Sequence, residues 1–289
     1  MSTGYGTERL TGSADFFYEP CQPGYASAGR RYAEQGYSSD CRLGQYLCGM
    51  FQVEEPGPGP IRVIPDGCND ILVTWDGRRV RSWLSPSIPA ACSFHYGEVQ
   101  WIFGVRFLPG ATYALFHREL EYSIRSRVEL ERLFRDISRI EQPLCKALSF
   151  ARRREIVEDY LAGQLARRPG VEQILSRCVA QIIRSDGLIP VQELAEESGY
   201  SVRYLRQLFV QHVGHSPKEL AMIVRMQRAL RWIWEHPGDS LGETAARFGF
   251  ADQSHMNREF RRFLGVTSGA VQGDTEWIAR LRPDFNRNF

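Results

Sequence analysis

The chain has 289 residues, of which 43% are hydrophobic and 24% charged, and its net charge is +2. This composition is ordinary for a globular protein, and the length suffices for two domains with separate cores. No run of about 18 apolar residues occurs, which argues against a transmembrane helix. The polar, glycine-rich first ten residues also lack the pattern of a secretory signal. We therefore expect a cytoplasmic protein with no membrane partner.

The cysteine and histidine content argues against a metal centre. The seven cysteines are loosely spaced and include no Cys-x-x-Cys pair, so we expect neither a disulfide framework nor a zinc module. A cupin metal site needs about three His and a carboxylate, but only His95 and His117 precede Pro169. We expect no metal, no cofactor and no enzymatic activity. The alternative is a metal-binding barrel enzyme with a DNA-targeting module.

The first part of the chain has the pattern of a β-rich domain. Residues 1–43 are rich in Gly, Ser, Tyr and Arg without a sustained period, and we expect an irregular arm. Short apolar runs between turn residues then predict strands over 45–53, 61–64, 70–75, 80–84 and 99–107. Asp76 and Gly77, between two of these runs, indicate a hairpin. This spacing is typical of a cupin-like β-barrel or sandwich, which we place at 44–109.

Helical patterns follow Gly110. The apolar period predicts helices over 111–116, 130–140 and 144–165. The sequence Arg-Arg-Pro-Gly at 167–170 ends the last of them and sets a domain boundary. We thus expect a sensor or dimerisation domain at 1–169, with its helices at 110–168, a DNA-binding domain at 170–272 and a tail at 273–289. The helix 144–165 either pairs across a dimer or packs on its own barrel. The fold class is α+β.

The helical half contains a partial internal repeat. Helices are predicted over 171–184, 191–198, 202–213, 217–235, 241–248 and 253–264. The matched pairs are Glu193 and Glu243, Ala195 and Ala245, Gly199 and Gly249, Tyr200 and Phe250, Leu205 and Met256, and Phe209 and Phe260. The offset is fifty residues before the turn and fifty-one after it. Each unit is a short helix, a glycine turn and a longer helix, which is the helix-turn-helix plan.

The residue types suit the binding of duplex DNA. Gly199 and Gly249 stand where the turn needs a positive φ, and Tyr200 and Phe250 are expected to anchor the turns in the core. The outward faces of the two second helices are predicted to carry the reading residues Val202, Arg203, Arg206 and Gln207, and Gln253, Ser254, Asn257 and Arg258. Arg pairs with guanine edges, and Asn or Gln with adenine edges.

The connector between the units has a fitting length. Residues 217–235 would form a helix of about 28 Å, and successive major-groove faces lie about 34 Å apart. One rigid helix can therefore set two recognition helices into neighbouring grooves, with Arg225, Arg228 and Arg231 along it supporting the arrangement. The overall charge neither supports nor excludes DNA binding, because residues 170–272 contain 12 Lys or Arg and 11 Asp or Glu.

This segment resembles the DNA-binding domain of the AraC/XylS family. The resemblance is carried by Leu194-Ala195, Ser198-Gly199-Tyr200-Ser201, Leu205, Leu208-Phe209, Gly214-His215-Ser216-Pro217, Ala245-Ala246, Gly249-Phe250, Asp252-Gln253-Ser254-His255, Arg258-Glu259-Phe260 and Gly265-Val266. It implies a transcription regulator whose two recognition helices read adjacent major grooves. Double-stranded DNA is the expected partner, and RNA polymerase and a second copy of the chain are further candidates.

The second unit departs from the family pattern. After Gly265, Val266 and Thr267 the family usually continues with Pro, but this chain has Ser268. Met256 also replaces a more common Phe or Leu. We therefore expect a looser closing cap and weaker DNA engagement by the second unit than by the first.

The N-terminal half carries a second, less specific resemblance. Residues 64–73 and 104–110 resemble a domain found on some AraC-type regulators and related to the β-barrel sensor domains of that family. A small molecule bound inside the barrel is then expected to modulate DNA binding. Its candidate ligand-binding residues are Trp75, Trp83, Trp101, Phe103 and Arg106. The alternatives are aromatic core residues, an Arg106 salt bridge, and a constitutive DNA-binding protein whose barrel only dimerises.

Overall fold

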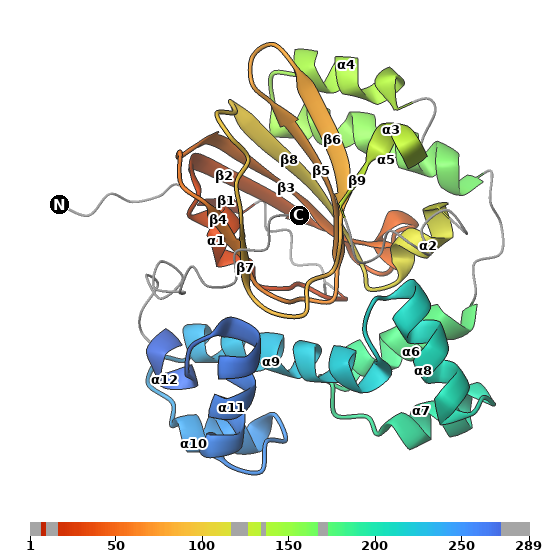
Figure 1. Cartoon of the computed structure of the whole chain (residues 1–289), viewed down its shortest axis with the longest axis vertical. Coiled ribbons are helices and arrows are strands. Elements are labelled where there is room, and N and C mark those ends of the chain that lie inside the picture. Colours follow the sequence, from red (N-terminus) through yellow and green to blue (C-terminus); the bar gives the residue numbers. More distant parts are fainter. Residues whose placement is uncertain (1–6, 10–16, 117–126, 134–136, 167–172, 273–289) are drawn as a thin grey trace.

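The structure is a computed structural model that describes residues 7–9, 17–116, 127–133, 137–166 and 173–272. It consists of a β-rich part, drawn above in Figure 1, and a helical part below it. Among the described residues, no helix combines the length and the apolar character needed to cross a membrane.

A large sheet forms the centre of the β-rich part. Its strands are β1 (Thr7–Arg9), β2 (Gly29–Gly36), β3 (Leu47–Pro56), β5 (Asn69–Trp75), β6 (Val80–Ser85), β8 (Trp101–Phe107) and β9 (Val128–Glu129), in the order β1-β2-β3-β8-β5-β6-β9. β1 and β2 are parallel, and all other neighbours are antiparallel. A second sheet pairs β4 (Ile61–Val63) with β7 (Cys92–Phe94). The described strands of the large sheet end at β1 and β9, so they form an open sheet rather than a closed barrel.

The large sheet is covered on both faces. The small sheet and helix α1 (Pro23–Ala26) pack on one face, where Phe51, Trp83 and Ile102 are buried. Helices α3 (Leu130–Leu133), α4 (Ser138–Lys146) and α5 (Phe150–Ala166) pack on the other face. Phe103 of β8 is buried there against Phe150, and successive strand residues point to opposite faces. Both layers therefore depend on β8, which is buried throughout.

The predicted strands correspond to β3, β4, β5, β6 and β8, and the predicted hairpin is present. The carboxylate of Asp76 accepts hydrogen bonds from the backbone N–H groups of Arg78 and Arg79, both at 2.7 Å. The expectation of an irregular arm over 1–43 was wrong, because β1, α1 and the eight-residue β2 lie in that range, and the short helix η1 (Leu43–Gln45) begins at its end. Only Tyr32 of β2 is buried. The sequence of this strand therefore lacks the alternation of apolar and polar residues by which a strand is predicted.

The helices of the first half depart from the predicted bounds after α2 (Ala111–Phe116), which matches its prediction. α4 ends at Lys146 and α5 begins at Phe150, because Ala147 has an extended backbone and breaks the helical run. Leu148 in this break is 97% exposed. α5 packs on its own sheet through Val157 and Leu161, which was one of the two alternatives for this helix.

The helical part matches the sequence prediction closely. Its helices are α6 (Gln173–Arg184), α7 (Val191–Ser198), α8 (Val202–His212), α9 (Pro217–Glu235), α10 (Leu241–Arg247), α11 (Gln253–Leu264) and α12 (Ser268–Val271). The predicted domain boundary falls within 167–172 and the predicted tail is 273–289, and both lie outside the described residues. α12 was not predicted.

Helix α9 joins the two parts of the molecule. It runs across the lower half of Figure 1, with α6–α8 at one end and α10–α12 at the other. Its fully buried Gln227 donates a hydrogen bond to the carbonyl of Pro65 at 2.7 Å and accepts one from the N–H of Cys21 at 2.8 Å. Arg231 of α9 also forms an ion pair with Glu19. The β-rich part is therefore attached along α9 by buried polar contacts as well as by apolar packing.

A buried charge cluster holds the loop that contacts α9. Arg106 forms a paired hydrogen bond with Asp70, at 3.0 and 2.8 Å, and lies 3.5 Å from Asp66. Burial lowers the pKa of Arg106, but Asp70 and Asp66 outweigh this effect, so its pKa lies above the usual value. Asp66 also accepts a hydrogen bond from Gln22 at 2.7 Å. The cluster thus fixes both Asp66 and the segment around Gln22.

Removing the arginine charge from this cluster should destabilise the protein. Arg106→Met leaves Asp70 buried without its ion-pair partner, which should lower the free energy of unfolding by about 3–5 kcal/mol. Urea denaturation followed by circular dichroism measures the change. The double variant Arg106→Met/Asp70→Leu removes both charges and should recover part of the loss. A loss below about 1 kcal/mol for Arg106→Met, the range of exposed pairs, would contradict the structural role.

Candidate nucleic-acid interface

The first helix-turn-helix unit consists of α7 and α8. α7 ends at Ser198 and is followed by Gly199, which has a φ of +73° and whose N–H donates to the carbonyl of Glu196 at 3.2 Å. Ser201 then caps α8, because its hydroxyl accepts a hydrogen bond from the N–H of Tyr204 at 3.2 Å. Leu205 and Phe209 are fully buried, as predicted. The short α7 and the longer α8 therefore form one packed unit with a tight turn between them.

Tyr200 does not anchor this turn in the core, in contrast to the prediction. Tyr200 is 39% exposed, and its ring stacks on the ring of Tyr204, with 4.8 Å between the centroids. In the second unit the corresponding Phe250 is buried, as predicted. That unit also has one more residue between its turn glycine and its second helix.

The second unit consists of α10 and α11. Gly249 has a φ of +66°, which confirms the predicted positive φ in this turn as well. Asp252 caps α11, because its carboxylate accepts a hydrogen bond from the N–H of His255 at 2.6 Å. Met256 and Phe260 are fully buried. The replacement of a common Phe or Leu by Met256 therefore leaves the inward face of α11 packed.

Seven of the eight predicted reading residues have exposed side chains: Val202, Arg203, Arg206, Gln207, Gln253, Ser254 and Arg258. Arg203, Arg206 and Arg258 form no ion pair with any residue that the structure describes. The acidic side chain next to Arg258, Glu259, pairs instead with Arg262 at 3.7 Å. Both recognition helices thus present positive charge that is not neutralised within the described part of the protein.

Asn257 differs from the other predicted reading residues. It is half-buried, and its side-chain oxygen accepts hydrogen bonds from the N–H and the hydroxyl of Ser268, at 2.9 and 2.8 Å. Ser268 is fully buried and begins α12, which Thr267 caps. The second unit is therefore closed at the position where a looser ending was expected. The side-chain oxygen of Asn257 is occupied by this closure.

Arg225 of α9 connects the two units. Its guanidinium donates to the carbonyl of Gly249, in the turn of the second unit, at 3.2 Å. It also donates to the carbonyl of Gly187, in the loop before α7, at 2.8 Å. Arg228 pairs with Asp186 of the same loop at 2.8 Å. Arg225 and Arg228 were predicted to support the arrangement of the two units. Their contacts connect α9 with the loop before the first unit and, through Arg225, with the turn of the second unit.

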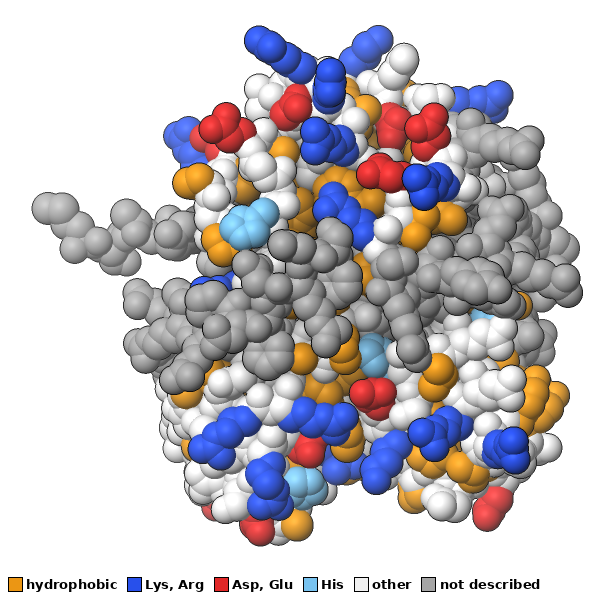
Figure 2. Space-filling model, viewed as in Figure 1, with side chains coloured by type: hydrophobic (Ala, Val, Ile, Leu, Met, Phe, Trp, Pro, Cys, Tyr) orange, Lys and Arg blue, Asp and Glu red, His pale blue; other side chains and the backbone are white. Residues whose placement is uncertain are grey.

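A hollow of about 1000 Å³ lies between the two units. Its basic lining residues are Arg206, Lys218, Arg225, His255 and Arg262, and its acidic ones are Glu219 and Glu259. A hydrogen bond from His215 holds the pKa of Glu219 below its usual value, and Arg262, 3.5 Å away, adds to the effect. In Figure 2 basic side chains occupy much of the helical part of this face, with acidic side chains among them.

The β-rich part contacts the units from a side that leaves most of the predicted reading residues exposed. Ser87 forms a hydrogen bond of 2.7 Å with the buried His215, which precedes α9. The N–H of Ala91 donates to the carbonyl of Phe263, near the end of α11, at 2.8 Å. These contacts reach the inner ends of both units, whereas the predicted reading side chains remain exposed, apart from the half-buried Asn257.

The predicted ligand-binding aromatic residues are divided between the two faces of the large sheet. Trp83 lies in the core under the small sheet, whereas Trp75, Trp101 and Phe103 pack on the helix-covered face. Arg106 is engaged by Asp70, which was the alternative interpretation. The cavity nearest to Asp70 holds only about 20 Å³. Four of these five side chains are buried in the core, and Trp75 is half-buried at its edge.

Comparisons with known proteins agree with the two-unit geometry. Residues 194–273 match the family model described as "Helix-turn-helix domain". The uncharacterized HTH-type transcriptional regulator YidL of Escherichia coli is 31% identical over 86 residues, which cover 30% of this chain and 29% of that protein. An HTH-type transcriptional regulator of Mycobacterium tuberculosis is 31% identical over 84 residues, which cover 29% of this chain and 32% of that protein. The chain thus spans about a third of the length of the curated relatives it matches.

Two solved structures are also similar in part. The C-terminal domain of AraT, a response regulator from Geobacillus stearothermophilus, covers 41% of this chain and 94% of its own, with 21% identity and a TM-score of 0.33. ToxT from Vibrio cholerae covers 75% of this chain and 91% of its own, with 11% identity and a TM-score of 0.38. Because these similarities are distant, the assignment of the helical part rests on the sequence match alone.

The packed units and the sequence match define the class of this part of the chain as a double helix-turn-helix module. Residues 194–273 are, more specifically, what the family model describes as a helix-turn-helix domain.

Two substitutions at Asn257 separate its structural role from base reading. Asn257→Ala removes the acceptor for Ser268, which should lower the free energy of unfolding by about 1–3 kcal/mol. Asn257→Asp keeps the accepting oxygen and should retain most of the stability. Thermal unfolding of both variants measures this difference. An unchanged stability for Asn257→Ala, together with altered preference for one base pair in selected DNA, would assign the residue to reading instead.

Proposed function

We propose that the chain is a transcription regulator that binds duplex DNA sequence-specifically through both helix-turn-helix units, and that it is not an enzyme. The observation that carries this proposal is the pair of outward helix faces with unneutralised arginines, held on one helix of 19 residues. Recognition helices of such units enter the major groove. The cytoplasmic location, RNA polymerase and a second copy of the chain as partners remain predictions that accompany this function.

The reading roles follow from side-chain chemistry. Arg203 and Arg206 of α8 and Arg258 of α11 can each offer paired donors to a guanine edge, and Gln207 and Gln253 can pair with adenine. Val202 and Ser254 offer an apolar and a small polar contact at the starts of the helices. We assign Asn257 to the closure of the second unit, so the first unit carries the larger share of base reading.

The hollow between the units suits the DNA backbone. When two recognition helices occupy successive major grooves, the phosphates between those grooves face the connector. Lys218 and Arg262 line that space, and phosphate contacts fix the register of a protein on the duplex without reading sequence. Binding should therefore weaken as salt rises, since each neutralised phosphate releases counterions.

We further propose that a small-molecule effector modulates DNA binding. The β-rich part contacts both units through Ser87 and Ala91, so a ligand that shifts this part would alter their placement. The alternative is a constitutive DNA-binding protein whose β-rich part only dimerises. Selection of bound DNA with and without cell metabolites distinguishes the two, because only the first proposal expects a metabolite to change occupancy of the selected site.

Loss of one reading arginine tests the main proposal. Arg206→Ala should weaken binding to the selected site by about 1–3 kcal/mol and relax the preference at one base pair. Fluorescence anisotropy with labelled duplexes measures both effects. Arg152→Ala is the matched control, because Arg152 is an exposed arginine of α5 that pairs with Glu155. Equal affinities for wild type and Arg206→Ala would remove Arg206 from the reading face.

Arg225 offers a test of the two-groove arrangement. Arg225→Gln removes the bridge between Gly249 and Gly187, so the two units should lose their fixed relation. Affinity for the full site should fall by about 1–2 kcal/mol, whereas affinity for a duplex containing only the first half should change little. Equal losses on the full and the half site would mean that the two units bind independently of this bridge.

A further inference from the structure

Two cysteines that are 20 residues apart in sequence lie side by side where the β-rich part meets the helical part. Cys48 of β3 and Cys68 of the loop before β5 are both buried, and 3.6 Å separates their Sγ atoms. They share a core cluster with Leu108 and with Leu220 of α9. All seven cysteines of the chain are free thiols. To form a disulfide, whose length is about 2.05 Å, the two sulfurs would have to approach by about 1.5 Å.

A β-bulge in β3 places Cys48 at this position. Leu47 pairs with Phe107 of β8, and Gly49 pairs with the preceding residue of β8. Cys48 is thus the extra residue between two consecutive pairs, and such bulges redirect a side chain that regular pairing would fix. Asn69, the first residue of β5, pairs with the same Phe107 from the other side of β8. The two cysteines therefore approach each other at the end of one central strand.

The surroundings of Cys68 make its thiol slow to react. Its N–H donates to the carboxylate of Asp66 at 2.9 Å. Burial raises the pKa of the Cys68 thiol, the contact with Cys48 and the charge of Asp66 raise it further, and Arg106 opposes them only in part. The thiolate is the form that attacks an oxidant, so little of the reactive form is present at neutral pH. The pair should therefore stay reduced unless its exposure to an oxidant is prolonged.

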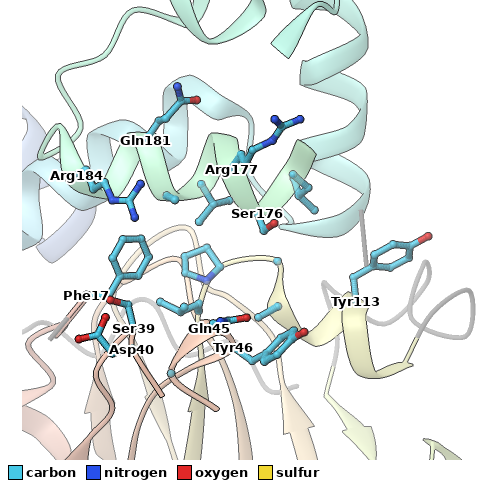
Figure 3. A pocket seen from close by; sticks show the side chains of 18 residues that line it. Phe17, Ser39, Asp40, Gln45, Tyr46, Tyr113, Ser176, Arg177, Gln181 and Arg184 are labelled. Atoms are coloured by element: carbon cyan, nitrogen blue, oxygen red, sulfur yellow. The ribbon is translucent and has the colours of Figure 1, made fainter. Parts of the chain in front are cut away.

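A small oxidant fits beside Cys68. This residue lines a cavity of about 20 Å³ whose polar lining also includes Asp66, Asp70 and Ser85, and such a volume holds about one water molecule. Hydrogen peroxide is only slightly larger than water and forms the same kinds of hydrogen bond. The wider cleft between the β-rich part and α6 in Figure 3 has no cysteine among the described residues that line it. The position of Cys68 therefore favours peroxide over a bulky disulfide oxidant.

The loop that carries Cys68 attaches the β-rich part to α9. A Cβ atom at Gly67 would lie 2.5 Å from Cδ1 of Leu220, so this glycine packs directly on α9. The carbonyl of Pro65 accepts a hydrogen bond from Gln227 of the same helix at 2.7 Å. β3, by contrast, is held between β2 and β8. Approach of the two sulfurs would therefore move the loop rather than the strand.

We propose that Cys48 and Cys68 form a redox-active pair that hydrogen peroxide converts into a disulfide, and that this bond draws residues 65–68 towards β3 and alters their contacts with α9. In the first step the Cys68 thiolate attacks a peroxide oxygen, the O–O bond breaks, and hydroxide departs from the resulting sulfenic acid. The sulfur of Cys48 then attacks that sulfenic acid, the S–S bond forms, and water leaves with the proton of the Cys48 thiol. The two thiols lose two electrons in total, and one peroxide becomes two molecules of water.

Peptide mapping of the full chain tests the bond. Protein purified in reductant is exposed to peroxide, denatured with an alkylating reagent and cut with trypsin, which places the two cysteines in separate peptides, 43–62 and 63–78. The two peptides should be found linked, and the link should disappear on reduction. Cys48→Ala and Cys68→Ala should each abolish it, whereas Cys178→Ala, in the same core cluster, should leave it in place. Absence of the link in peroxide-treated wild type, or links mainly to other cysteines, would overturn the proposal.

Nuclear magnetic resonance tests the effect of the bond on α9. The side-chain amide of Gln227 and the methyl groups of Leu220 should shift in the oxidised protein relative to the reduced protein. Peroxide should shift neither set of resonances in Cys48→Ala, which is the matched control. Unchanged resonances in a sample that contains the linked peptides would overturn the proposed movement of the loop. Neither experiment uses DNA, so this proposal and the proposed function can fail independently.

Discussion

The burial of Gln227 is the constraint on which the arrangement of the molecule depends. This amide lies on the central helix α9 and is 2% exposed, so its polar atoms need partners within the protein. It finds them on the backbone at Cys21 and Pro65, in two segments far from it in sequence. A buried amide without these partners would be costly, which ties the two segments to α9 in one relative position.

The same two segments lead into the charge cluster of the β-rich part. Gln22 follows Cys21 and donates to Asp66, and Asp66 lies beside Arg106. Arg106 sits on β8, the strand on which both layers of the sheet pack. A continuous set of buried polar contacts therefore extends from the centre of the sheet to the helix that carries both helix-turn-helix units. Apolar packing alone would allow these parts to slide, whereas hydrogen bonds with fixed directions do not.

The helical half was predictable because its signals are local. Glycine turns, capping residues such as Ser216 and apolar residues at helical spacing define each helix without distant information, and α9 has its predicted bounds. The β-rich half was less predictable. β2 carries polar side chains because it pairs with β3 but contributes few buried residues, and the partners of Arg106 lie 36 and 40 residues away in sequence. The exposure of most predicted reading residues followed from the repeat, but the hydrogen bonds of Asn257 depend on α12, whose four residues have no periodic signal.

The extra residue in the second turn has a consequence for the target. It makes the two units unequal, with a stacked exposed tyrosine pair at the start of α8 and a buried phenylalanine before α11. Both units lie in tandem on one chain and in fixed order along α9. Reversing the direction of the duplex would therefore present each unit with the wrong sequence. Under the proposed function, a single copy of this protein would therefore bind an asymmetric site in one orientation only, and its position on a promoter would carry a direction as well as a place.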